Sequence, residues 1–188
     1  MKRLRYWLNL FVFTISFLAL GIIGTVGFFT YQKAIEYPHP SRVGREADDT
    51  PAQYGVSFQD ITLTTADGLK LSAWYTPSQN GAIILAAHGY HNYRHADVHA
   101  LFAKHGYGVV SWDFRSHGLS EGDLSTIGYY EVLDVEAALD FALKQPNVKN
   151  VGAWGESMGA STSIIATAKR SEIKVLVADS PFATLEGQ

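Results

Sequence analysis

Ser157 lies at the centre of the pentapeptide 155–159, Gly-Glu-Ser-Met-Gly, in which a glycine stands two residues away on each side. An apolar run at about 148–154 precedes the serine and a segment of helical pattern follows it, so a sharp strand-to-helix turn is predicted. Such a turn lifts the hydroxyl above a sheet and leaves no room for side chains at Gly155 and Gly159. The pattern predicts a nucleophile that attacks carbonyl groups. The alternative is a serine that only caps the helix.

Two backbone amides are predicted to hold the oxyanion that such an attack creates. The helix after Ser157 directs its dipole and the amide of Met158 toward the developing negative charge. The second amide is expected from the loop that follows the apolar run 82–87. This loop begins with His88, Gly89 and Tyr90. Gly89 allows the backbone to turn inward, and Tyr90 is therefore the predicted donor. His88 is interpreted as a structural prop that hydrogen-bonds its own loop.

The other ionisable side chains near these motifs are assigned non-catalytic roles. Glu156 is expected to be exposed or to support the turn rather than to act as a catalytic acid. His91, His95 and His99 recur every fourth residue, a spacing that permits metal ligation, but no acid accompanies them as in a His-Glu-x-x-His helix. We expect solvated histidines at the start of a helix, and no metal or other cofactor is predicted.

Alternating strand and helix patterns position these motifs. Strand patterns occupy about 58–64, 69–76, 82–87, 108–112, 148–154 and 174–178, and helix patterns occupy about 95–105, 128–144 and 158–170. The first two strands flank Ala66-Asp67-Gly68, a turn sequence that predicts a hairpin. The later alternation predicts an α/β fold with an open, mostly parallel sheet and helices on both faces. Ligands of such sheets bind at the carboxyl ends of the strands, where Ser157 is expected.

The amino-terminal segment has the composition of a membrane anchor. No charged residue occurs from Trp7 to Tyr31, which is longer than the roughly 20 residues that a bilayer requires. Lys2, Arg3 and Arg5 precede this run, so the amino terminus is predicted to be cytoplasmic and the remaining chain extracytoplasmic. A cleaved signal peptide and a buried soluble helix are the alternatives. The expected parts are a basic tip with a transmembrane helix at 1–31, a linker at 32–56 and a partial α/β domain at 57–188.

Composition excludes several classes of function. Apolar residues make up 47% of the 188-residue chain and charged residues 18%, which is typical of a globular protein with a sizeable core. The formal net charge of -3 provides no positive field, so nucleic acid is not an expected partner. The absence of cysteine excludes disulfides, thiolate metal sites and a cysteine nucleophile.

Three blocks of this sequence resemble the α/β-hydrolase superfamily, in particular its lysophospholipase-like, esterase and peptidase-related serine hydrolases. They are His-Gly-Tyr at 88–90, Asp-Phe-Arg-Ser-His-Gly-Leu-Ser at 113–120 and the pentapeptide at 155–159. In the family the middle block braces the active-site floor. Ser116 replaces its usual glycine, so that loop is expected to be less sharply turned. The resemblance covers roughly residues 57–185, and the serine nucleophile excludes the dehalogenase and epoxide-hydrolase activities, which use aspartate.

The resemblance implies hydrolysis of an ester, thioester or amide through an acyl-enzyme, with a small-molecule, lipid or peptide acyl substrate. It also implies a catalytic acid and then a histidine after the nucleophile, but all seven histidines, from His39 to His117, precede Ser157. His117 is not expected to replace this base, and a serine without one is a poor nucleophile. The chain alone is expected to be nearly inactive.

We interpret the chain as the amino-terminal part of a longer hydrolase, truncated after about the sixth strand. The acids that follow the nucleophile are Glu172, Asp179 and Glu186. Asp179 stands one strand earlier than the family's usual acid. The alternative interpretation is a complete protein that has lost catalysis and binds a ligand or partner at the membrane surface.

Overall fold

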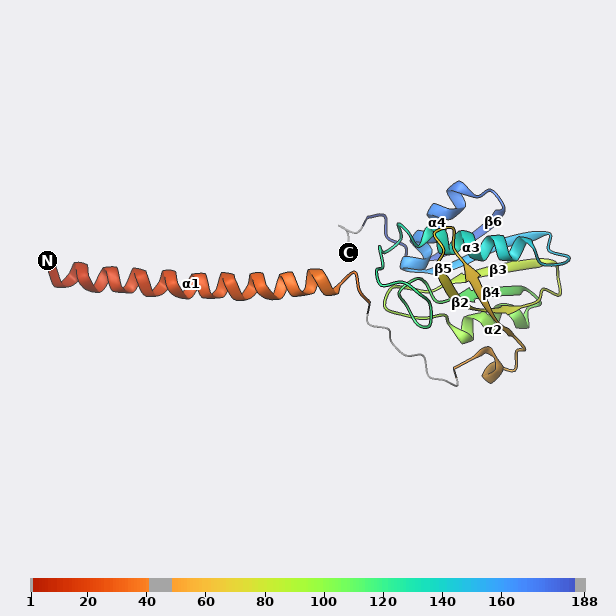
Figure 1. The fold of residues 1–188 in the computed structure, drawn as a ribbon, viewed down its shortest axis with the longest axis horizontal. Helices are drawn as coiled ribbons and strands as arrows, with labels where there is room; N and C mark the ends of the chain where they lie inside the picture. Colours follow the sequence, from red (N-terminus) through yellow and green to blue (C-terminus); the bar gives the residue numbers. More distant parts are fainter. Residues whose placement is uncertain (1, 41–48, 185–188) are drawn as a thin grey trace. The chain divides into compact units, whose positions relative to one another are not determined.

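The computed structural model describes residues 2–40 and 49–184 (Figure 1). The chain divides into two units, Met1–Pro38 and His39–Gln188. The first unit is formed by helix α1 (Lys2–Glu36), which buries none of its side chains. By length and composition this helix can cross a membrane. The predicted amino-terminal helix is therefore present.

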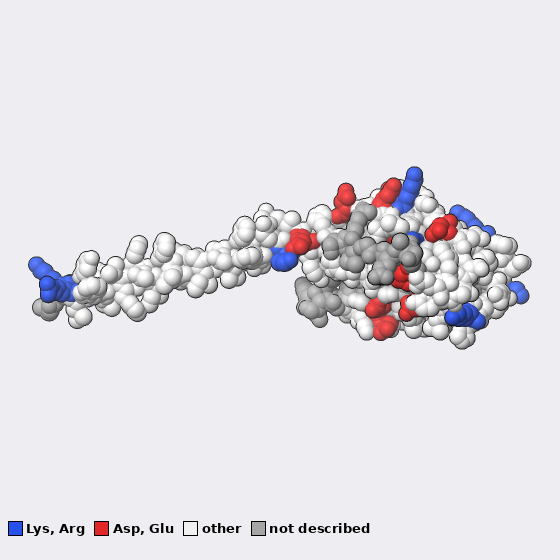
Figure 2. Space-filling model, turned by 90° about the horizontal axis from the view of Figure 1, so that it is seen from below, with Lys and Arg blue, Asp and Glu red and all other residues white. Residues whose placement is uncertain are grey.

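Charged side chains lie at the two ends of α1. Lys2, Arg3 and Arg5 gather at its amino-terminal end, and the surface of its middle part carries no charge (Figure 2). Near the other end, Lys33 Nζ lies 2.6 Å from a carboxylate oxygen of Glu36. This distribution keeps the charges outside the apolar stretch, which is the arrangement a bilayer-spanning helix requires.

The expected linker at 32–56 contains more regular structure than its composition indicated. It begins as helix, because α1 continues to Glu36, and it ends with a short 3₁₀ helix at Pro51–Tyr54. Gly55 ends this turn with φ 75°, a conformation that favours glycine. Residues 41–48 lie outside the described residues.

The strands of the second unit form one mixed sheet. Within residues 49–184, the strands are β1 (Gln59–Thr64), β2 (Lys70–Thr76), β3 (Ala82–Ala87), β4 (Gly108–Trp112), β5 (Asn150–Glu156) and β6 (Ile173–Asp179). Their order across the sheet is β1-β2-β4-β3-β5-β6. β1 and β2 form the predicted hairpin, and β2 runs antiparallel to β4. β4, β3, β5 and β6 are parallel, which confirms the predicted fold class.

Helices cover both faces of this sheet. α2 (Ala96–Lys104) lies on one face, and α3 (Val132–Leu143) and α4 (Met158–Lys169) lie together on the other (Figure 1). The predicted helix at 128–144 begins only at Val132. The carboxylate of Glu131 accepts hydrogen bonds from the backbone amides of Thr126 and Gly128, which holds the chain before α3 in a turn.

The central strands bury side chains toward both helical layers. Leu85 and Val110 belong to the main core, which β-strand residues form with α3 and α4. Their strand neighbours Ala86 and Val109 belong to a second cluster together with residues of α2. Two buried faces require continuous apolar strands, which is why the run 82–87 was recognisable in the sequence.

Candidate active site

Ser157 occupies the turn between β5 and α4 in a conformation that non-glycine residues rarely adopt. Its backbone has φ 49° and ψ -112°, a strained combination that surrounding contacts must maintain. Its N–H donates to the carbonyl of Asp179 at 2.8 Å, and its carbonyl accepts from the N–H of Ser161 at 3.0 Å. The half-buried side chain makes no capping hydrogen bond to α4. Within the described residues, its hydroxyl therefore has no hydrogen-bond partner.

The two glycines of the pentapeptide allow close approach of the backbone. A Cβ atom on Gly155 would lie 2.5 Å from the carbonyl carbon of Gly159. A Cβ on Gly159 would overlap the carbonyl oxygen of Ala87 and lie 2.6 Å from that of His88. Neither glycine has a positive φ. The backbone strain of this turn is thus confined to Ser157, and the glycines are required for packing.

His88 connects the loops that follow β3 and β4. Its Nδ1–H donates to the carbonyl of Gly89 at 2.6 Å, and its Nε2 accepts from the N–H of Phe114 at 2.9 Å. These bonds require the neutral imidazole. Complete burial holds the pKa of His88 well below its ordinary value, and the neighbouring His117 adds to this effect. Both ring nitrogens are occupied, so the imidazole supports the loop.

The loop after β3 lies against the nucleophile turn. A Cβ on Gly89 would be 3.6 Å from both Ser157 Cβ and a carboxylate oxygen of Glu156. Tyr90 follows directly, is half-buried and packs against the main core. The structure therefore brings together the two loops from which the oxyanion donors were predicted.

Glu156 forms a hydrogen bond with His95 across these loops. Its carboxylate lies 3.1 Å from His95 Nε2, and both side chains are partly exposed. His95 is the residue that precedes α2. We call this pair the Glu156–His95 clasp. It connects the start of α2 to the nucleophile turn. The sequence did not indicate this partner of Glu156.

The prediction that the three regularly spaced histidines are solvated is wrong for His99. Its side chain is fully buried; Ser111 Oγ donates to Nδ1 at 2.7 Å and Nε2–H donates to Thr76 Oγ1 at 2.8 Å. Burial lowers the pKa of His99 to about 3, with a smaller effect of the Arg94 charge. His95 instead contacts Glu156, so the ring nitrogens do not converge on one point. Ala96, Ala100 and Ala103 form the buried face of α2, and His99 lies on this same face. The helical spacing of these alanines was the sequence signal that indicated burial of His99.

Asp113 braces the block 113–120 from inside. One carboxylate oxygen accepts from the N–H of Arg94 and the other from the N–H of Leu119, each at 3.0 Å. A Cβ on Gly118 would overlap this carboxylate. Ser116, which replaces the usual glycine, nevertheless has φ 64°, so the expectation of a less sharply turned loop is wrong.

Arg115 joins the hairpin turn to α3. Its guanidinium contacts the carboxylates of Asp134, at 2.7 Å and 2.9 Å, and Asp67, at 2.8 Å and 3.2 Å. The hydrogen bonds from Arg115 lower the pKa of Asp67. The contact with Asp67 uses both carboxylate oxygens. A bidentate contact fixes the relative orientation of the two side chains and also pairs their charges.

His117 has no nitrogen left for proton transfer. Its Nδ1–H donates to the carbonyl of Arg115 at 2.9 Å, and its Nε2 accepts from the N–H of His91 at 3.3 Å. Burial lowers the pKa of His117. The neutral side chain therefore holds its own loop by hydrogen bonds at both ring nitrogens.

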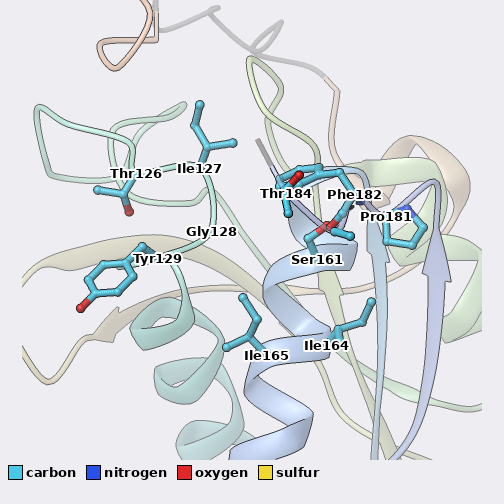
Figure 3. Close-up of a pocket in the computed structure, with 11 residues that line it drawn as sticks. Thr126, Ile127, Gly128, Tyr129, Ser161, Ile164, Ile165, Pro181, Phe182 and Thr184 are labelled. Atoms are coloured by element: carbon cyan, nitrogen blue, oxygen red, sulfur yellow. Dashed lines mark hydrogen bonds between the residues drawn. The ribbon is translucent and has the colours of Figure 1, made fainter. Parts of the chain in front are cut away.

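Glu131 is a buried carboxylate that sequence reasoning missed. It accepts four hydrogen bonds of 2.7–2.9 Å, from the hydroxyls of Ser125 and Thr126 and from the backbone amides of Thr126 and Gly128. The loop that it fixes lines a cavity of about 530 Å³ beside α4 (Figure 3). The sequence signal for this role was an acidic residue directly before an apolar helix. The groups that donate hydrogen bonds to Glu131 lie in the irregular loop before it, and such a loop has no recognisable pattern.

Comparison with known proteins identifies the family. The X-Pro dipeptidyl-peptidase (S15) family matches residues 51–187. The chain belongs to this family. Among solved structures, an esterase of Pyrococcus furiosus superposes with a TM-score of 0.70 at 35% identity, over 76% of this chain and 55% of the esterase. The S15 match and this fold confirm the α/β-hydrolase superfamily predicted from the three blocks.

Curated relatives of this S15-family chain extend beyond it. An uncharacterized membrane protein of Saccharomyces cerevisiae is 25% identical over 80% of this chain and 55% of its own length. A thiohydrolase of Aspergillus aculeatus is 26% identical over 67% of the chain and 42% of its own length. An uncharacterized protein of Mycobacterium tuberculosis is 28% identical over 91% of this chain and 61% of its own length. The chain thus spans about half of the length of these relatives. The S15 family, the esterase and the thiohydrolase support hydrolase as the general class.

Proposed function

We propose that the chain carries the nucleophile and the oxyanion hole of a membrane-anchored serine hydrolase. The observation that carries this proposal is the strained backbone of Ser157, at φ 49° and ψ -112° between β5 and α4. A strained residue persists only where surrounding structure maintains it, and such residues concentrate at active sites. The half-buried hydroxyl, without a partner among the described residues, suits attack on a substrate.

The proposed reaction proceeds through an acyl-enzyme. Ser157 Oγ attacks the carbonyl carbon of an ester, thioester or amide, and its proton passes to a general base. The amides of Met158 and Tyr90 hold the oxyanion, a contribution of about 3–4 kcal/mol per donor in known cases. Collapse of the intermediate breaks the bond to the leaving group, and water then releases the acyl group. His88, Gly89, Gly155 and Gly159 position these atoms.

The proposed base and acid come from residues other than those described above. His88 and His117 both use their two ring nitrogens in structural hydrogen bonds, and no histidine follows Ser157 in this sequence. The relatives are longer than this chain. We therefore assign the acid and histidine to the portion of the relatives that this chain does not span.

The proposed protein is held in a membrane by α1. The apolar helix with Lys2, Arg3 and Arg5 at its amino-terminal end favours a cytoplasmic amino terminus and an extracytoplasmic hydrolase domain. The name of the yeast relative, a membrane protein, agrees with an anchored state. The substrate is accordingly a small-molecule, lipid or peptide acyl compound on the outer side.

A second candidate is a binding protein of the same fold without catalysis. It is favoured by one observation, the structural engagement of both His88 and His117. A chain whose nearby imidazoles are occupied in this way retains a shaped site without a base. Reactivity of Ser157 separates the two candidates.

Labelling of the full-length protein with a fluorophosphonate tests the proposal. The wild-type protein should be labelled and Ser157→Ala should not. Ser163→Ala is the matched control, because Ser163 lies on α4 and its buried hydroxyl has no hydrogen-bond partner in the described structure. Label that persists in Ser157→Ala would contradict the nucleophile, and an unlabelled wild type would favour the binding protein.

A further inference from the structure

Two adjoining cavities form a groove along α4. The first has a volume of about 530 Å³ and is lined by Ser161 and Ile165 among others (Figure 3). The second, of about 310 Å³, shares Gly128, Tyr129 and Ile165 with the first and continues to Lys169. Ser161, Ile165 and Lys169 recur every four residues, so they follow one face of the helix over about 12 Å. We call these two cavities the α4 groove.

The α4 groove begins one helical turn from Ser157. Ser161 lies one helical turn after Ser157, and the two are joined by the hydrogen bond between their backbone groups. Four residues of helix correspond to about 6 Å. A substrate whose carbonyl group lies at Ser157 therefore has the mouth of this groove within reach of its next few atoms.

One wall of the α4 groove is rigidly built. The buried carboxylate of Glu131 holds the loop of Thr126 and Gly128 by hydrogen bonds to both backbone amides. Figure 3 shows this loop facing the α4 side chains across the cavity. A buried charge that is satisfied by several donors fixes local geometry. This wall thus exists before any ligand binds.

The lining of the first cavity selects an uncharged, apolar ligand. None of its eleven lining residues is charged. The hydroxyl of Ser161 is already engaged, because it accepts from the N–H of Phe182 at 2.8 Å and donates to the Phe182 carbonyl at 2.9 Å. A peptide amino terminus would lose its water without an acidic partner here, which costs free energy. A hydrocarbon chain has no such cost and gains from burial.

We propose that the α4 groove binds the hydrocarbon chain of a long-chain ester or thioester whose carbonyl lies at Ser157. This inference rests on the proposed function and names its substrate class. The chain follows the helix from Ser161 toward Lys169, and the reacting carbonyl stays at the turn. Anchoring by α1 places the domain near a membrane, where acyl lipids are abundant.

Alkyl fluorophosphonates of two lengths test this proposal. The full-length protein in digitonin, a detergent without an alkyl chain, is treated with an ethyl and a dodecyl probe, and the rates of labelling are compared. The dodecyl probe should react about tenfold faster, because burial favours the longer chain. Ile165→Trp, which fills the groove, should reduce the ratio of the two rates to near one. Leu101→Trp, on the exposed side of α2, should keep the wild-type ratio.

The possible outcomes test the groove and the nucleophile separately. Labelling of Ser157 by both probes at equal rates in the wild type overturns the groove and leaves the proposed function standing. A chain-length preference that survives in Ile165→Trp also overturns it. Labelling by neither probe overturns the proposed function, and dodecanoate binding measured by calorimetry then tests the groove without the reaction. Binding that is weakened about tenfold in Ile165→Trp supports the groove, and no binding to the wild type overturns it.

Discussion

Acidification should destabilise the hydrolase unit through its buried histidines, and His99 allows the effect to be calculated. Its pKa is lowered from 6.5 to about 3 in the folded protein, chiefly by burial. The unfolded chain therefore binds a proton below pH 6.5 that the folded chain excludes. Stability is fully present above pH 6.5 and is lost as the pH falls below it, by about 1.4 kcal/mol per pH unit. Between pH 7 and pH 5, His99 alone removes about 2 kcal/mol.

Urea unfolding at pH 7 and pH 5, followed by tryptophan fluorescence, measures this loss. His99→Gln removes the ionisable ring, so the difference in unfolding free energy between the two pH values should shrink by about 2 kcal/mol relative to the wild type. His105→Gln changes an exposed ring at the end of the same helix and serves as the matched control. An equal pH dependence in wild type and His99→Gln would show that His99 is not the source of the loss.

Three further perturbations test the turn, the clasp and the membrane topology. Gly159→Ala should cost about 2 kcal/mol in unfolding free energy, because the added methyl group meets the backbone carbonyls of Ala87 and His88; unchanged denaturation would contradict the packing role. Glu156→Ala should slow fluorophosphonate labelling about fivefold by losing a hydrogen bond worth about 1 kcal/mol, whereas Glu156→Gln should restore the rate; equal rates in both variants would dismiss the clasp. Since the chain has no cysteine, Lys144→Cys on the exposed end of α3 should react with an impermeant maleimide on intact cells, and reaction only after lysis would reverse the topology.

Much of the fold could be predicted because its signals are local. The bounds of the strands 82–87 and 108–112 were predicted to the residue. The first is a continuous apolar run between turns, a pattern that has few alternatives. The hairpin around Asp67 followed from its turn sequence. The start of α3 was misplaced, because the carboxylate of Glu131 captures loop amides that helical periodicity cannot reveal.

The position of the site could be predicted from the sequence, but most of the contacts that hold its loops in place could not. Sequence motifs located Ser157 and the loop of Tyr90, and they predicted the close packing at the two glycines. They did not indicate that the strained backbone of the turn is that of the serine itself. Arg115 pairs with Asp67, 48 residues away in the sequence, and such distant contacts have no local signature. His99 was misread because its spacing with other histidines concealed an apolar helix face.

Direct trapping of the acyl-enzyme shows whether Ser157 is the nucleophile. The full-length protein is mixed with an activated ester, quenched in acid within the first turnover and digested, and the acylated peptide is identified by mass spectrometry. One acyl group is expected on Ser157, and none is expected in Ser157→Ala. An acyl group on another residue, or turnover that persists in Ser157→Ala, would contradict the assignment of Ser157 as the nucleophile.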